Sequence, residues 1–176
     1  GFTSLLVDKY DVYQVNLPKR TTPIEGYDLL ILSKPTSAFT EQEKYTLDQY
    51  VMNGGRMMMF LDALSVNMDS ASGEGTFAFP YNTNLNDLLF KYGVRINANY
   101  IQDINCGVFP VVAGNMGDQA QIRMLPWPFF PLINAYGDHQ IVRNLDASIM
   151  KFASTIDTVK AEGIKKTPLM LTSPYT

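Results

Sequence analysis

The alternation of apolar and polar residues is clearest between residues 27 and 64, where two apolar runs flank an amphipathic segment. Residues 28–32 (DLLIL) and 56–61 (RMMMFL) each lead into a polar turn, which is the pattern of strands buried on both faces. The segment between them begins with Thr40 and Glu43, which have the spacing of a capping box. Leu47, Tyr50 and Val51 form its apolar face, and Gly54 and Gly55 provide its stop signal. The pattern predicts one strand–helix–strand unit with parallel strands.

A second helix and several short strands are expected farther along the chain. The apolar spacing of residues 85–92 predicts a helix that is capped by Thr83 or Asn84 and stopped by Gly93. Residues 65–84 have no sustained period and are long for a connection, so we expect a functional lid or a mobile insertion there. Further strands are expected at residues 10–17, 94–101, 107–112, 149–159 and 169–172.

These elements predict an α/β fold in which helices flank an open, mostly parallel sheet, as in flavodoxin-like and class I glutamine amidotransferase-like proteins. With 176 residues, 46% of them apolar, the chain is expected to form a single soluble domain over residues 1–176. The chain opens on a helical spacing and closes just after a strand-like run. We therefore expect this domain to be a piece of a larger, membrane-anchored protein.

Composition excludes several classes of function. Fourteen basic and seventeen acidic residues give a net charge of −3 with no basic patch, so nucleic acid is not an expected partner. No apolar run approaches the ~20 residues that cross a bilayer, so any membrane anchor is expected in segments absent from this chain. One cysteine and one histidine do not supply the usual ligands of a zinc site, and we expect neither a metal nor another cofactor.

The order Cys106, His139, Glu162 superficially matches the catalytic triad of class I glutamine amidotransferases. A nucleophile elbow needs small residues on both sides of the cysteine, whereas Asn105 precedes Cys106 and the segment after Gly107 cannot open a helix. We expect Cys106 to be a structural thiol and His139 to be a hydrogen-bonded structural residue, so catalytic residues are not expected.

Two groups of residues are candidates for binding. Ser33, Lys34 and Asp62 follow the two apolar strands, and ligands of open parallel sheets bind outside the carboxyl ends of the strands. The alternative is that Ser33 and Asp62 only cap turns, which is a common role of Ser and Asp.

The second group lies in the proline-bracketed aromatic run at residues 125–131 (LPWPFFP). It is expected to be a rigid loop that plugs the edge of the core. The alternative is an interaction surface formed by Trp127 and Phe129.

Three stretches of the chain resemble one known family. Residues 27–64 (YDLLILSKPTSAFTEQEKYTLDQYVMNGGRMMMFLDAL), 125–132 (LPWPFFPL) and 139–175 are similar to segments of GldG-like proteins, the gliding-motility-associated auxiliary components of ABC transporters in Bacteroidota. The family usually has Pro after the histidine, where this chain has Gln140.

The resemblance implies a non-enzymatic auxiliary or substrate-binding domain at the periplasmic face of the inner membrane. Its implied partners are the permease and the ATP-binding subunits of the transporter. Related domains act as interaction modules in intraflagellar transport proteins, so a protein–protein interaction scaffold is an alternative function. A diverged amidotransferase-like hydrolase is a further alternative.

Overall fold

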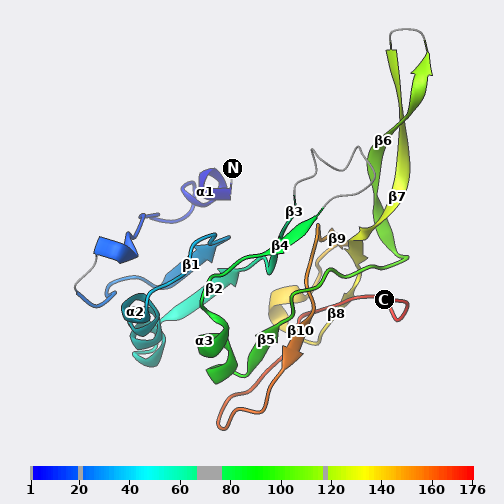
Figure 1. Ribbon diagram of the computed structural model, residues 1–176. Coiled ribbons are helices and arrows are strands. Elements are labelled where there is room, and N and C mark those ends of the chain that lie inside the picture. Colours follow the sequence, from blue (N-terminus) through cyan, green and yellow to red (C-terminus); the bar gives the residue numbers. More distant parts are fainter. Residues whose placement is uncertain (1, 20–21, 67–76, 117–118) are drawn as a thin grey trace.

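A computed structural model describes residues 2–19, 22–66, 77–116 and 119–176 of the chain. Helical segments are few and short (Figure 1): α1 (Phe2–Leu6), η1 (Leu17–Lys19), α2 (Glu41–Met52), α3 (Asn86–Lys91) and η3 (Gln140–Val142). The strands of the first half are β1 (Leu29–Ser33), β2 (Arg56–Phe60), β3 (Leu64–Val66), β4 (Ala78–Pro80) and β5 (Val94–Ile96). Those of the second half are β6 (Cys106–Met116), β7 (Gln119–Ile133), β8 (Ala135–Tyr136), β9 (Ser148–Ile149), β10 (Ile156–Thr158) and β11 (Met170–Leu171).

The predicted strand–helix–strand unit is present. β1 and β2 pair in parallel, with Leu29 opposite Arg56 and Ser33 opposite Phe60, and α2 connects them. The capping box is formed: the backbone N–H of Thr40 donates to Glu43 Oε2 at 2.8 Å, and the backbone N–H of Glu43 donates to Thr40 Oγ1 at 3.3 Å. The turn after α2 requires glycine, because a Cβ on Gly55 would lie 2.5 Å from the ring of Tyr50.

The prediction of an open, mostly parallel, flavodoxin-like or amidotransferase-like sheet is wrong. Within the described residues the strands form four two-stranded sheets and one three-stranded sheet, and β1–β2 is the parallel pair. The other pairings, β5–β10, β8–β11, β3–β4, β6–β7 and β7–β9, are antiparallel. One parallel unit does not specify the whole sheet, because most of the later strands are too short to extend it and β6 pairs antiparallel with β7.

Two small apolar clusters lie on one face of β1–β2. Ile24, Leu47 and Tyr50 form one cluster against Leu30 and Met57. The second cluster is formed by Leu88 and Leu89 of α3 and by Leu85, which precedes the helix. It packs against Leu32 and Met59, which lie farther along the same face of β1–β2. This confirms the apolar faces that were predicted for both helices.

The opposite face of β1–β2 remains open. Leu29, Met58 and Phe60 are 43–45% exposed, so the expectation of strands buried on both faces is wrong. Parallel strands are covered on both faces when helices pack on each side, whereas α2 and α3 both pack on the same side here.

Other expectations for single elements also need correction. Residues 10–17 form no strand, and the predicted strand at 94–101 is only the three residues of β5. The N-cap of α3 is Leu85, without a side-chain cap, and Asn84 instead donates to the backbone oxygen of Phe39 at 2.9 Å. Within the expected lid at 65–84, the described part contains β4 and most of β3, while residues 67–76 lie outside the described residues.

Candidate functional site

The ends of β1 and β2 bring two of the predicted binding residues together. Lys34 Nζ lies 2.8 Å from Asp62 Oδ2, and their side chains are 69% and 38% exposed. The backbone N–H of Lys34 donates to the oxygen of Phe60 at 2.8 Å, and Lys34 has a φ of 46°. Ser33 ends β1 as an exposed residue. The pairing follows from the parallel register, which places both carboxyl ends at the same edge.

A small cavity lies beside Asp62. Its volume is about 110 Å³, and its polar lining includes Asp62, Tyr81, Thr83 and Asn86. Sites for small molecules in proteins have volumes of roughly 300–1,000 Å³. The cavity is therefore of a size for a few water molecules or one small group of a ligand.

The hydroxyl of Tyr100 interacts electrostatically with Asp62 at this edge of the sheet. Burial raises the pKa of its hydroxyl, and the negative charge of Asp62 and the neighbouring Tyr81 raise it further. The hydroxyl is buried and has no hydrogen-bond partner among the described residues. The phenol therefore stays protonated at neutral pH and retains a donor that a bound group or an ordered water would satisfy.

The aromatic run forms part of β7, so the expectation of a rigid loop is wrong. Pro126 pairs with Val108 and Pro131 pairs with Cys106 along the β6–β7 register. Proline forbids a helix, but a strand tolerates it where the missing N–H points away from the neighbouring strand. The three prolines exclude a helix but are compatible with the extended backbone of β7.

The aromatic side chains of β7 join a larger cluster. Phe130 is 5% exposed, whereas Trp127 and Phe129 are half-buried. The Trp127 ring centroid lies 5.2 Å from that of Phe109, and Phe129 lies 6.3 Å from both Tyr100 and Phe152. The indole N–H of Trp127 is buried without a partner among the described residues. The run thus packs the base of β6–β7 against the β9–β10 connection.

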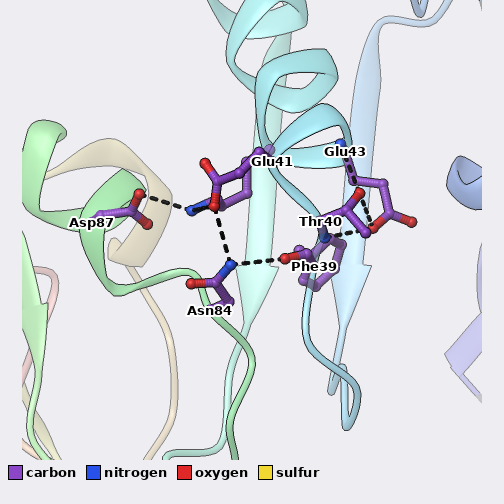
Figure 2. Close-up of polar contacts among 7 residues, drawn as sticks. Phe39, Thr40, Glu41, Glu43, Asn84 and Asp87 are labelled. Carbon is purple, nitrogen blue, oxygen red and sulfur yellow. Dashed lines mark hydrogen bonds and ion pairs between the residues drawn. The ribbon is translucent and has the colours of Figure 1, made fainter.

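A buried lysine, Lys44, holds α2 against α3 through Glu41 and Asp87, both of which are labelled in Figure 2. Lys44 is 5% exposed, and its Nζ lies 2.7 Å from Glu41 Oε1 and 2.8 Å from Asp87 Oδ2. Asn84 Nδ2 also donates to Glu41 Oε1, at 3.3 Å. The hydrogen bonds to Asp87 and Glu41 raise the pKa of Lys44, and those from Lys44 lower the pKa values of both carboxyl groups.

This arrangement supports a structural role. All three groups remain charged at neutral pH, so Lys44 is neither a nucleophile nor a base. A groove of about 340 Å³ runs beside the pair, lined by Tyr45, Asp48, Leu88, Lys91 and the three charged groups. Sequence reasoning missed Lys44; the available signal was its position three residues before Leu47, on the apolar face of the helix.

His139 and Cys106 lie at the starts of different elements, η3 and β6. His139 precedes η3, and its Nδ1 accepts a hydrogen bond from the backbone N–H of Ile141 at 3.2 Å. This confirms the expected hydrogen-bonded histidine. Cys106 is half-buried at the start of β6, where it is paired with Pro131.

Groups of three or more His, Cys, Asp or Glu side chains that could hold a metal ion are absent from the part of the chain that the structure describes. In that same part, every helix is too short or too polar to cross a bilayer.

Comparison with known proteins identifies the family. The model of the family described as an ABC-type uncharacterized transport system, the ABC transporter auxiliary family, matches residues 1–176, which is the whole chain. The chain belongs to this family. Membership in the auxiliary family supports an accessory role in transport. The description of the auxiliary family names a transport system and not a class of enzyme.

The other comparisons add less. None of the curated proteins matches the chain. A solved structure described as the mmIFT52 N-terminal domain is similar at 18% identity, with a TM-score of 0.47. The match covers 76% of this chain and 51% of that one, so the chain spans about half the length of the solved domain.

Proposed function

We propose that this chain is a non-enzymatic, extracytoplasmic auxiliary domain of an ABC transporter of the GldG-like, gliding-motility-associated type. One observation carries the proposal: the transporter auxiliary family model covers the chain from end to end. In this proposal residues 1–176 are a single domain of a longer, membrane-anchored protein. The domain lies at the periplasmic face of the inner membrane and works with a permease and an ATP-binding subunit.

The chemistry of the described residues is consistent with this role. Lys44 and its acidic partners are locked in ion pairs, and the Nδ1 of His139 is already bonded to the backbone. The cavity beside Asp62 is small compared with sites for metabolites, and the groove of about 340 Å³ beside Lys44 is lined in part by charged groups that already pair with one another. We therefore place contact with transporter subunits ahead of solute binding among the functions of this domain.

Co-purification of the full-length protein from its own membranes tests the transporter assignment. We expect the permease and the ATP-binding subunit to be retained by the tagged full-length protein. Recovery of the tagged protein alone, from membranes in which permease and ATP-binding subunit still co-purify with each other, would contradict the proposal.

Location and motility are tested separately. Protease added to spheroplasts should cleave the domain without lysis, and cleavage only after lysis would contradict the periplasmic position. A deletion strain of a gliding member should lose spreading, and the wild-type protein should restore it. A deletion strain that spreads normally would remove the link to gliding.

A protein–protein interaction scaffold is the second candidate. The specific observation that favours it is the long β6–β7 hairpin, which carries exposed apolar side chains such as Val112 and Ile122. A scaffold would retain other proteins without the ATP-binding subunit in the same co-purification.

A further inference from the structure

The β6–β7 hairpin is a long antiparallel ribbon that projects from the rest of the molecule (Figure 1). Residues directly opposite each other in an antiparallel pair point to the same face, and successive pairs alternate between faces. Regular register runs from Val108 opposite Pro126 to Val112 opposite Ile122. Every second pair along this stretch therefore shares one face of the ribbon.

That face is apolar and exposed. It consists of three cross-strand pairs, Val108 with Pro126, Pro110 with Met124, and Val112 with Ile122, which we call the ribbon face. Its four aliphatic side chains are more than half exposed: Val108 52%, Val112 62%, Ile122 66% and Met124 57%. Both prolines are exposed as well. The opposite face carries the charged side chain of Arg123, whereas the ribbon face has no charged residue.

The geometry disfavours two other ways of covering this surface. Pro110 lacks an N–H, and register shifts between 106 and 108 and between 112 and 114 interrupt β6. Both features disfavour the pairing of a further strand with the outer edge of β6. Between Ala113 and Ile122 the chain reads GNMGDQAQ. Such a polar sequence is costly to place in hydrocarbon, which disfavours insertion of this part of the chain into a bilayer.

The charge and area of the ribbon face are compatible with a weak interface to a second copy of the chain. An uncharged face meets no like-charge repulsion from its own copy, and homodimer interfaces are more apolar than interfaces between transient partners. The six residues expose on the order of 500 Å², so complete burial on both copies would remove roughly 1,000 Å², which reaches the lower limit for a specific interface and is smaller than an obligate homodimer interface.

The whole chain also has surface left to cover. Its accessible surface is 13123 Å² for 19.8 kDa, whereas a compact monomer of this mass has roughly 8,600 Å². The excess is several times the area of the ribbon face, so a dimer through this face leaves the surface that the proposed transporter subunits need.

We propose that the ribbon face is a homodimer interface, packed against the ribbon face of a second copy of this chain. The two-fold axis passes near Pro110 and Met124, the central pair of the face. Each copy then contributes the same six side chains, and any charge introduced on the face is buried twice.

Sedimentation velocity of the 176-residue chain over a wide range of concentration tests the proposal, with Ile122→Arg as the variant. The control is Ile141→Arg, the same substitution at an isoleucine of similar exposure, 68% against 66%, in η3. We expect wild type and Ile141→Arg to shift from monomer to dimer, and Ile122→Arg to remain monomeric. Because Ile122 is exposed, its replacement should leave the circular dichroism spectrum unchanged.

A cysteine placed on the axis gives a second measurement. In a Cys106→Ser background, Met124→Cys should form a covalent dimer on mild oxidation, since Cys106 is the single native thiol. A wild-type chain that stays monomeric throughout, or a dimer that Ile122→Arg leaves intact, would overturn the proposal. So would a monomer that binds vesicles or co-purifies with the permease through the same face.

Discussion

At the scale of single residues, the most constrained charge of the described chain is Asp103. It is fully buried, and its carboxylate accepts hydrogen bonds from the backbone N–H of Asn105 at 2.8 Å and from Ser173 N and Oγ at 2.9 and 2.6 Å. Burial by itself raises the pKa of Asp103, but the bonds from Ser173 and Asn105 outweigh it and hold the pKa below its ordinary value. This residue ties the segment before β6 to the last residues of the chain.

We expect Asp103→Ala to lower the free energy of unfolding by about 3 kcal/mol, because it leaves several buried donors without an acceptor. Ser173→Ala removes one of the donors and leaves the carboxylate in place, so its cost should be smaller. Urea unfolding of both variants checks the order. Equal losses would show that the carboxylate is not the centre of this network.

The effect of Asp103 should depend on pH. Since its pKa is lower in the folded chain than the ordinary value of 3.8, its stabilisation is present above that value and is lost as the pH falls through the folded pKa. Between pH 7 and pH 3, the difference in unfolding free energy between wild type and Asp103→Asn should therefore shrink. A difference that is constant over this range would contradict the depressed pKa.

The Lys34–Asp62 and Lys44–Asp87 ion pairs should contribute differently to the stability of the fold. Lys34 and Asp62 are exposed, so Asp62→Asn should change stability by less than about 1 kcal/mol. Asp87→Asn removes a carboxylate from Lys44, which is 5% exposed, and should lower the melting temperature more. Thermal melts of the two matched variants decide this, and a larger effect of Asp62→Asn would reverse the ranking.

At the scale of the elements, β7 shows how one strand can contribute both a core face and an exposed face. Toward its end, Phe130 and Ile133 are buried. Nearer the tip of the hairpin, Ile122 and Met124 are exposed. Trp127 lies between these two parts, half-buried against Phe109. The element therefore changes from core strand to projecting ribbon along its length.

We expect Trp127→Ala to cost about 3 kcal/mol, the lower end of the range for truncating a large core aromatic, because the indole packs against two rings. Trp127→Phe keeps most of this packing and removes the buried N–H that has no partner among the described residues. Its cost should therefore be below about 1 kcal/mol. If alanine and phenylalanine were equally mild in chemical denaturation, the indole would be an interaction residue and not a core residue.

At the scale of the whole molecule, small apolar clusters must stabilise a chain with a large exposed surface. The clusters around Leu47 and Leu88 lie on the same face of β1–β2, while the ribbon projects away from them. Partners that bind only the folded chain add stability by mass action. Oligomerisation is therefore expected to contribute to the measured stability of this protein.

If two copies associate through the ribbon face, the melting temperature should rise with protein concentration. The rise should be absent in Ile122→Arg and present in Ile141→Arg. Calorimetry over a range of concentrations checks this. A melting temperature that is independent of concentration in the wild type would contradict a dimer that stabilises the fold.

The local elements whose signals lie within one turn or one face could be predicted from the amino-acid pattern alone. The capping box of α2, the leucine face of α3 and the parallel pairing of β1 with β2 need only short-range spacing and one crossover. The ion pair of Lys34 with Asp62 follows from that same pairing. The burial of Lys44 had a weak signal, a lysine on an apolar helical face.

The pairing partners of the later strands could not be predicted from local patterns. The β6–β7 ribbon, the bonds between Asp103 and Ser173, and the open face of β1–β2 depend on contacts between residues far apart in the chain. Strand propensity specifies an extended backbone but not its neighbour, since the same short run can join a parallel sheet or fold back as a hairpin. This is why one strand–helix–strand unit was a poor guide to the sheet as a whole.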